Sequence, residues 1–298
     1  MRSAIGSDRT EKTRSMANPK TNQTKSSSKL DFATIAGLIL AFGGIIAGLL
    51  MEGGKIQDVA QVTSALIVLG GTIGAVMITT PLPVCLGAAK KIAHIFFGKD
   101  ESPGPVLEEI IGYATQARKD GIVSLESQVT AIADPFLNKA LSLAVDGIES
   151  AAIRDIMDLE IQIMEENIDA EAKVFESAGG YAPTIGIIGA VLGLIQVMKN
   201  LANIDEVGRG IAVAFVATIY GVASANIIFL PAAGKLKARG REAVQLRELM
   251  LEGVLSIANG VNQKLIRLKL EAYVGTKPVV KLAKQKGKPS VETVSAEG

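Results

Sequence analysis

The chain has 298 residues and a formal net charge of +1, which argues against a nucleic-acid-binding protein because such proteins carry a concentrated basic face. Hydrophobic residues make up 48% of the sequence, which contains 31 glycines but no tryptophan. Aliphatic residues and glycine in these amounts are typical of helices packed closely in a membrane. The single cysteine, Cys85, excludes an internal disulfide bond.

The N-terminal segment, residues 1–31, is polar, and its basic side chains outnumber its acidic ones. Because it lacks the apolar residues that a core needs, we expect it to be disordered. Met16 is a candidate for the native start of translation. The apolar run that follows is too long for a secretory signal and is not followed by a cleavage motif.

The next segment, residues 32–80, predicts a transmembrane hairpin. Residues 32–51 and 59–80 contain no charged residue, and each stretch is close to the ~20 residues that a membrane helix needs. Glycines spaced four apart occur in both stretches, which is the spacing of closely packed membrane helices. A short polar loop, residues 52–58, joins the two spans, and Pro81 marks the end of the second one.

Residues 81–178 are polar and amphipathic, and they predict a helical cytoplasmic domain instead of a linker. A helix is expected over residues 106–119, where apolar residues share one face. Asp134 and Pro135 form a break, and from about Glu149 the chain is acidic and periodic as in a helix.

A second transmembrane hairpin is predicted over residues 179–234. The third span runs from Tyr181 to about Ala202, and the fourth span from Ile211 to Gly234, with a short polar loop over residues 203–209. Glycines in the third span are expected to clear space for the neighbouring helices: Gly186, Gly189 and Gly193.

Beyond the fourth span, residues 235–275 predict a cytoplasmic helix that continues the span, and residues 276–298 a disordered basic tail. The apolar residues on which the helix prediction rests are Leu246, Met250, Val254, Ile257, Val261, Leu265 and Leu268.

The distribution of basic residues predicts the orientation of the spans. Lys90 and Lys91 follow the second span, and Lys235 and Lys237 follow the fourth, whereas the short loops within the hairpins are not basic. Because basic flanks stay in the cytoplasm, both termini are expected to be cytoplasmic. The sequence therefore predicts an all-α integral membrane protein with four transmembrane helices in two hairpins and a helical cytoplasmic domain between the second and third spans.

The four spans contain no Asp, Glu, His or Arg, and their one lysine, Lys199, stands at an outer edge. A self-contained transporter normally marks its pathway with an ionisable residue in the membrane. Hydroxyl-bearing residues such as Thr184 and Thr218 remain, and taken singly each is more often a structural residue that bonds to its own backbone. No phosphate-binding loop, metal cluster or nucleophile triad is present, so we expect no enzyme activity and no cofactor.

Two longer motifs carry a family resemblance. Residues 181–194 read Y-A-P-T-I-G-I-I-G-A-V-L-G-L, and residues 210–231 read G-I-A-V-A-F-V-A-T-I-Y-G-V-A-S-A-N-I-I-F-L-P. Together with R-K-D-G-I-V-S-L-E at 118–126 and M-D-L-E-I at 157–161, they resemble the proton-channel subunits of the bacterial flagellar stator, in the MotA/TolQ/ExbB family. The resemblance extends from about residue 32 to residue 273.

The resemblance implies roles for individual positions. Pro183 and Pro231 would lie near the cytoplasmic side of the channel and couple ion passage to movement of the cytoplasmic domain. Thr218 matches a pore-facing threonine. Arg118 and Glu126 match a charged pair that contacts the rotor protein FliG, although exposed charges are often no more than a solvated surface.

The resemblance also implies partners. A MotB-like protein, with one span and a peptidoglycan-binding domain, would bring the channel aspartate that these spans lack, and five copies of this chain would surround two of MotB in the lipid of a bacterial inner membrane. Sodium-driven relatives carry a threonine where this chain has Ala190, so the missing hydroxyl predicts proton coupling.

Three other interpretations compete with a stator subunit. An ion-driven energiser of the ExbB or TolQ type also forms pentamers around a partner's aspartate, but such proteins usually have three spans. A self-contained transporter is disfavoured by the absence of a titratable residue at mid-membrane. A purely structural membrane scaffold would conduct no ions with or without a partner.

Overall fold

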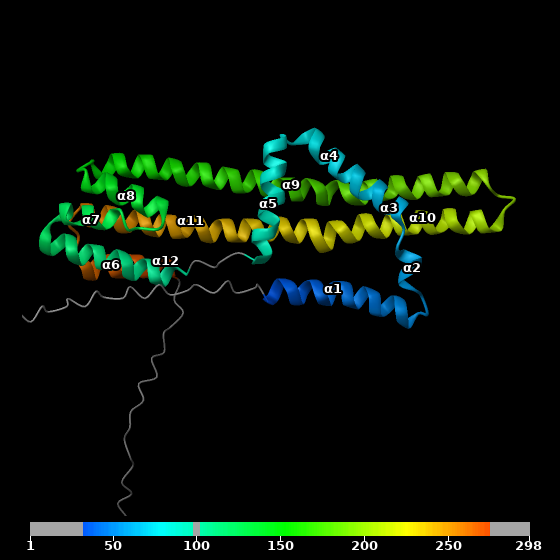
Figure 1. Ribbon diagram of the computed structural model, residues 1–298, viewed down its shortest axis with the longest axis horizontal. Coiled ribbons are helices and arrows are strands. Elements are labelled where there is room, and N and C mark those ends of the chain that lie inside the picture. The colour runs from blue at the N-terminus through cyan, green and yellow to red at the C-terminus, as the bar shows by residue number, and fades with distance from the viewer. Residues whose placement is uncertain (1–31, 98–101, 275–298) are drawn as a thin grey trace, which may run out of the picture.

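The computed structural model describes residues 32–97 and 102–274, and within these ranges every regular element is a helix. The predicted disordered segments, residues 1–31 and 276–298, lie outside the described residues. Two long antiparallel rods run the length of the molecule and the shorter helices pack around them (Figure 1). The first rod is α9 (Ser150–Lys199), and the second consists of α10 (Ile204–Ala223), the π-helical segment η3 (Ser224–Phe229) and α11 (Leu230–Ala258).

The turn between the rods is shorter than the sequence predicts. The expected loop over residues 203–209 is already helical from Ile204, because the side chain of Asn203 accepts a hydrogen bond from the backbone N–H of Asp205 at 3.1 Å. Asparagine is a favoured helix cap, and acidic residues in the first turn, here Asp205 and Glu206, favour a helix N-terminus.

Glycines bring the two rods into backbone contact in their membrane halves. A Cβ atom added to Gly186 would lie 2.9 Å from the carbonyl oxygen of Ala217, and one added to Gly193 would lie 2.7 Å from that of Gly210. On the opposite rod, a Cβ on Gly221 would lie 2.6 Å from the carbonyl oxygen of Ala182. The predicted role of the glycines in close packing is therefore confirmed for these positions, and no side chain fits between the rods there.

The second span is interrupted near its start, contrary to the prediction of one helix from Val59. After the short helix α2 (Ile56–Val59) the backbone is extended at Gln61, and helix resumes as α3 (Val62–Ala65), the π-helical segment η1 (Leu66–Gly70) and α4 (Gly71–Thr79). Helix α4 ends before Pro81, as predicted.

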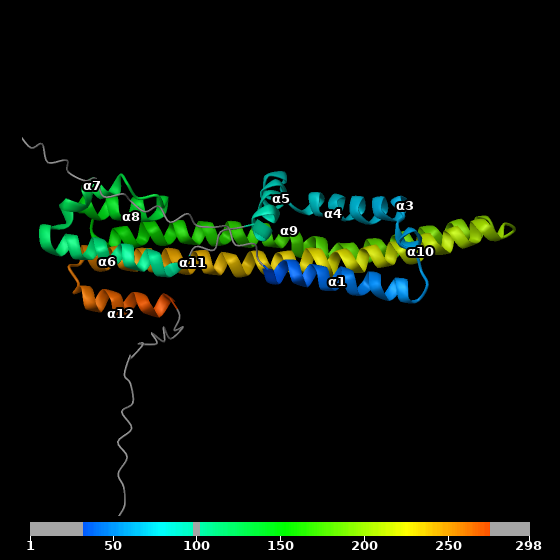
Figure 2. The ribbon, with the colours of Figure 1, turned by 60° about the horizontal axis from the view of Figure 1, so that its bottom comes forward.

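The first span is α1 (Phe32–Met51), with the predicted bounds. It lies on the opposite side of the two rods from α3 and α4, and both views show this separation (Figures 1 and 2). Its apolar stretch, Thr34–Met51, has no buried residue. The first two spans are therefore consecutive in the chain without packing directly on each other.

The part of the chain that is predicted to be cytoplasmic gathers around the ends of the rods that lie far from the α9–α10 turn. It contains α6 (Pro103–Asp120), the 3₁₀ turn η2 (Ile122–Leu125), α7 (Glu126–Val129) and α8 (Pro135–Val145), while α5 (Leu82–Phe97) crosses the rods between this part and the membrane spans (Figure 1). Pro135 occupies the first turn of α8, and Asp134 caps it by accepting hydrogen bonds from the backbone N–H groups of Phe136 and Leu137. The fully buried large side chains of this region are Phe136, Ile110, Leu125, Leu137, Leu141, Ile153, Met157, Leu249, Met250, Ile266 and Leu270.

The single C-terminal helix predicted over residues 235–275 is wrong. α11 ends at Ala258, Gly260 has a φ of +64°, and α12 (Gln263–Val274) turns back to pack on α6. A positive φ is easily adopted only by glycine, so this residue permits the turn. The turn also changes which side chains face inward: Ile266 and Leu270 are buried, whereas the predicted Leu265 and Leu268 are exposed.

Ion pairs tie α12 to its neighbours. Arg267 donates two hydrogen bonds to the carboxylate of Glu108 on α6, at 2.6 and 2.8 Å. Glu252 on α11 accepts from Arg154 on α9 at 3.0 Å and also pairs with Lys269 on α12. The second group links three helices through one carboxylate.

Candidate functional site

The two prolines singled out by the sequence lie in the same stretch of the paired rods, offset from each other along it. Helix α9 continues through Pro183, and Pro231 stands in the first turn of α11, directly after η3. Pro183 follows Ala182, whose carbonyl oxygen would lie 2.6 Å from a Cβ atom on Gly221. Pro231 follows Leu230, whose side chain would lie 2.6 Å from a Cβ atom on Gly179, one turn before Pro183. Antiparallel packing therefore places both prolines along the segment in which residues 179–183 face residues 221–230.

Each proline removes one backbone hydrogen bond from its rod. Proline has no N–H group, so the carbonyl of the residue four positions earlier loses its helical donor. In α9 that carbonyl belongs to Gly179. Before Pro231 the backbone N–H of Leu230 bonds to the carbonyl oxygen of Ala225, five positions earlier, so Pro231 ends the π-helical pattern of η3. A π-helical segment before Pro231 is an additional irregularity of the kind often found at functional sites. Both rods are thus weakened within one stretch of the pair, without being broken there.

Thr218 and Ala190 lie in the paired rods, closer to the α9–α10 turn than the prolines. The hydroxyl of Thr218 donates to the carbonyl oxygen of Ala214 at 3.1 Å, and the side chain is half-buried. Ala190 is also half-buried and follows Gly189, whose added Cβ would lie 2.7 Å from the Cβ of Ala217. The structure therefore places both residues within the glycine-packed part of the pair.

A tyrosine holds the interrupted second span against the fourth. The hydroxyl of Tyr220 donates to the carbonyl oxygen of Val59 at 2.6 Å and accepts from the backbone N–H of Gln61 at 3.3 Å. Ser64 strengthens the same junction by donating to the carbonyl oxygen of Val213 at 3.3 Å. The sequence does not predict these contacts, because the partners of Tyr220 lie 161 and 159 residues away in the chain. The only local signal is a hydroxyl group within a predicted span.

Arg118 and Glu126, the predicted rotor contacts, belong to α6 and α7, and these helices lie at the end of the molecule away from the α9–α10 turn, at the left of Figure 1. Arg118 is exposed in the last turn of α6, and Glu126 is exposed at the start of α7. Gln116 holds the two segments together by donating to the carbonyl oxygen of Ser124 at 3.1 Å. Among the described residues neither charge forms an ion pair, so both are available to a partner.

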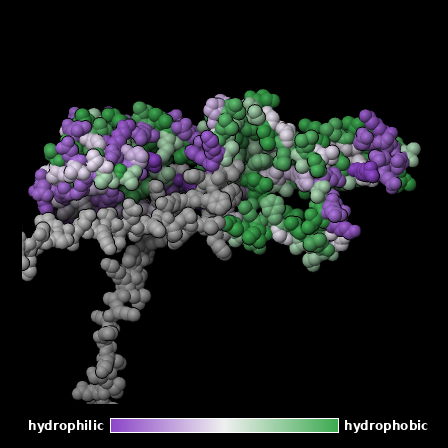
Figure 3. Space-filling view, in the orientation of Figure 1, coloured by the Kyte–Doolittle hydropathy of each residue, from purple (hydrophilic) through white to green (hydrophobic). Residues whose placement is uncertain are grey.

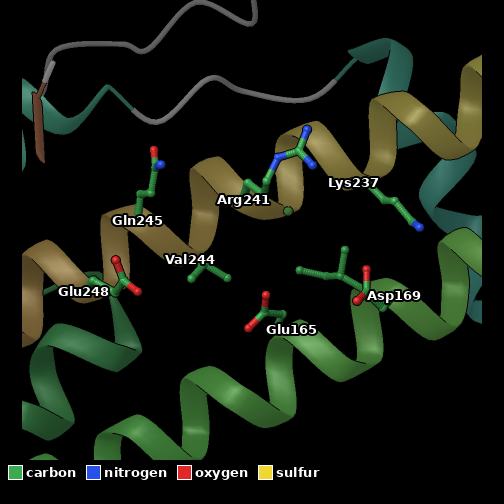
Figure 4. A pocket seen from close by; sticks show the side chains of 9 residues that line it. Glu165, Asp169, Lys237, Arg241, Val244, Gln245 and Glu248 are labelled. Atoms are coloured by element: carbon green, nitrogen blue, oxygen red, sulfur yellow. The ribbon is translucent and has the colours of Figure 1, made fainter.

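Between the prolines and the end of the molecule that carries α6 and α7, an ion pair joins the two rods and a cavity opens beside it. Lys237 on α11 lies 2.9 Å from the carboxylate of Glu176 on α9. This hydrogen bond lowers the pKa of Glu176 and raises the pKa of Lys237. A cavity of about 470 Å³ follows, and Asp169 and Val244 point into it from opposite rods (Figure 4). The cavity opens beside a close contact between the rods, because a Cβ atom on Gly240 would lie 2.5 Å from the side chain of Ile168.

The surface has separate hydrophobic and hydrophilic regions, as is typical of a membrane protein. Hydrophobic residues cover α1, α3, α4 and the middle of the rods, whereas hydrophilic residues cover the cytoplasmic helices and the α9–α10 turn (Figure 3). Four helical stretches are long and apolar enough to cross a membrane. No group of His, Cys, Asp and Glu suited to a metal ion occurs in the described ranges. Fold and surface define a membrane protein whose long spanning helices continue directly into a polar helical domain.

Comparisons with known proteins give the family. Residues 35–117 match the N-terminal domain of motility protein A, and residues 128–249 match the MotA/TolQ/ExbB proton channel family. Motility protein A of Bacillus subtilis is 38% identical over 261 residues, which cover 86% of this chain and 95% of that protein. The chain therefore belongs to the motility protein A branch of the MotA/TolQ/ExbB family.

Solved structures agree with this assignment. The C. jejuni MotAB structure aligns with a TM-score of 0.78 at 32% identity, covering 82% of this chain and 96% of the matched chain. The flagellar MotAB stator complex of Bacillus subtilis aligns with a TM-score of 0.74 at 37% identity, covering 80% and 94%. The likeness thus includes both the spans and the cytoplasmic helices.

Proposed function

We propose that the chain is the ion-conducting subunit of a bacterial flagellar stator, in which ion flow through the membrane moves the cytoplasmic domain and drives the rotor. The observation that carries this proposal is the continuity of the rods. Helix α9 and the α10–α11 rod each pass from the membrane into the cytoplasmic core without a break in helical structure. A rearrangement in the stretch that contains the two prolines would therefore be transmitted along rigid helices to the far end.

The partner supplies the titrating group. Because the four spans contain no carboxylate, a MotB-like protein with one span would contribute an aspartate to the ion path. Both solved relatives are MotAB assemblies, which supports such a partner and an oligomer. We propose a pentamer of this chain around two partner chains, each anchored to peptidoglycan, with Pro183, Ala190, Thr218 and Pro231 along the ion path.

The proposed orientation places both termini and the helical domain in the cytoplasm, with the spans in the lipid of the inner membrane. Lys235 and Lys237 follow the fourth span, and the positive-inside rule assigns that end to the cytoplasm. Arg118 and Glu126 would then face the rotor protein FliG. The proposal requires no cofactor, and the transported ion is the only small species that it involves.

Ion flux tests the proposal directly. Cells or vesicles that contain the chain with its MotB-like partner should conduct protons, whereas the chain alone should not. Flux through the chain alone would support a self-contained transporter, and no flux in either sample would support a scaffold. Restored swimming in a strain lacking its own subunit would separate a stator from an ExbB-type or TolQ-type energiser.

Ala190 leads to a prediction of ion choice. An alanine provides no oxygen ligand for a dehydrated sodium ion, so swimming should continue in sodium-free medium and stop when the proton gradient is collapsed. The measurement is the swimming speed of free cells, or the rotation rate of tethered cells, under the two conditions. The opposite pattern, sensitivity to sodium removal with resistance to a protonophore, would contradict proton coupling.

Reversal of the charge at Arg118 should weaken rotation without affecting assembly, because this side chain is exposed and forms no ion pair among the described residues. Complementary charges steer and register a transient contact, so the reverse substitution of a facing acid on the rotor should restore part of the torque. Torque measured on beads attached to flagella for Arg118→Glu, alone and with rotor charge reversals, checks this. Equal rescue by rotor sites unrelated in position would show that the contact is not specific.

A further inference from the structure

A small hollow opens beside Arg118 at the end of the cytoplasmic part. It has a volume of about 210 Å³ and lies where the end of α6 meets η2, the last turn of α11 and the turn that leads to α12. Its wall combines apolar side chains with polar atoms in nearly equal parts, and the apolar side chains are those of Ala117, Ile122, Ile257, Ala258 and Val261.

The hollow exists because small residues stand where the helices end. Ala117 and Ala258 are half-buried, and each presents only a methyl group to the space. Gly260, with its φ of +64°, turns the chain away directly after α11 and adds no side chain. A pocket of this size is below the ~300 Å³ at which small-molecule sites begin, and it matches a single large apolar side chain.

The rim of the hollow carries one charge. Arg118 is the charged residue among those that line it, and it is exposed. Val123, in the adjoining η2 turn, is 65% exposed and extends the apolar surface. A small pocket that is lined by apolar side chains and bordered by an arginine suits an interface hot spot, because an anchor side chain can fill the pocket while the arginine pairs with a neighbouring carboxylate.

We infer that this hollow is a socket for one apolar side chain of the rotor protein, of leucine, methionine or phenylalanine size, next to an acidic residue that pairs with Arg118. This inference rests on the proposed function, which places this end of the chain against the rotor. The socket supplies short-range apolar contact, and Arg118 supplies long-range attraction. Since one side chain fills it, the contact is small and releases readily, as a partner that moves past repeatedly requires.

Filling the socket tests the inference. Ala117→Leu and Ala258→Leu extend side chains into it from opposite walls and leave Arg118 in place. Ala151→Leu, an exposed position in the first turn of α9, is the matched control. Each variant is purified as the full complex with its MotB-like partner, its melting temperature is recorded, and binding of the purified rotor protein is measured beside that of Arg118→Glu.

Both socket variants should weaken rotor binding by about 10-fold or more, the loss typical of an interface anchor, while Ala151→Leu binds as the unaltered chain does. The melting temperatures and the partner-dependent proton flux of both socket variants should stay unchanged. If only one variant binds more weakly and that variant also melts at a lower temperature, the proposal of a socket is overturned. Normal binding by both socket variants together with weak binding by Arg118→Glu would overturn the socket and leave the rotor contact standing. Normal binding by all three would overturn both the socket and the proposed rotor contact.

Discussion

Replacement of Pro183 or Pro231 by leucine is expected to abolish swimming while the chain still reaches the membrane and assembles with its partner. Leucine is a good helix former and restores an N–H donor at each position. In α9 the carbonyl of Gly179 would then regain the hydrogen bond that proline denies it, and at the end of η3 the added N–H could join the helical pattern. The rods would become stiffer in the stretch where both are weakened.

The position of the prolines explains why the expected loss is in movement and not in assembly. Pro231 is exposed and Pro183 half-buried, so leucine fits at both without filling a tight site. The backbone contacts between the rods are made by Gly186, Gly193 and Gly221, and not by the prolines themselves, although Gly221 contacts Ala182, the neighbour of Pro183. Ion flux and swimming should therefore fail together in variants that co-purify normally with the partner.

Pro105→Leu provides the control for this experiment. Pro105 is exposed in the first turn of α6, where a missing N–H costs the helix nothing. Swimming speed, membrane content and co-purification should be unchanged in this variant. Normal swimming of both Pro183→Leu and Pro231→Leu would refute the assigned role of the prolines, whereas loss of the complex would show that the prolines act in folding.

Local patterns predict the spans and most of the helices because hydrophobicity and helical period act over short distances. α1 has the bounds that its uncharged run predicts, and α6 begins and ends within a few residues of the predicted helix. The same local reasoning fails at Asn259–Asn262. The apolar period continues across this turn, and only the packing of Ile266 and Leu270 onto α6 shows where the chain reverses.

Contacts between residues that are far apart in the chain cannot be predicted from local sequence patterns. Pro183 and Pro231 can be selected from their motifs, but their place in the same stretch of the rods depends on the antiparallel register. The bond from Tyr220 to Val59 exists because a distant tyrosine satisfies a carbonyl that the interrupted helix exposes. The socket beside Arg118 likewise depends on the ends of three helices that meet only in the fold.

A single methyl group at Gly221 is expected to destabilise the protein, whereas the same change at Gly180 should not. A Cβ on Gly221 would lie 2.6 Å from the carbonyl oxygen of Ala182 and 3.0 Å from the Cα of Gly186. Both are backbone atoms of the opposite rod, so no side chain can move aside. The rods themselves must separate, and overpacking of this kind typically costs about 1–3 kcal/mol.

Gly180 lies on α9 near the same level and has no atom within 4 Å of an added Cβ. Alanine there should be neutral or should stabilise the helix by up to about 1 kcal/mol, because alanine loses less backbone entropy than glycine. Thermal unfolding of the purified complexes, followed by helical circular dichroism, should give a lower melting temperature for Gly221→Ala and an equal or higher one for Gly180→Ala. Equal destabilisation by both changes would mean that the loss of glycine flexibility, and not the backbone contact between the rods, determines the stability of this pair.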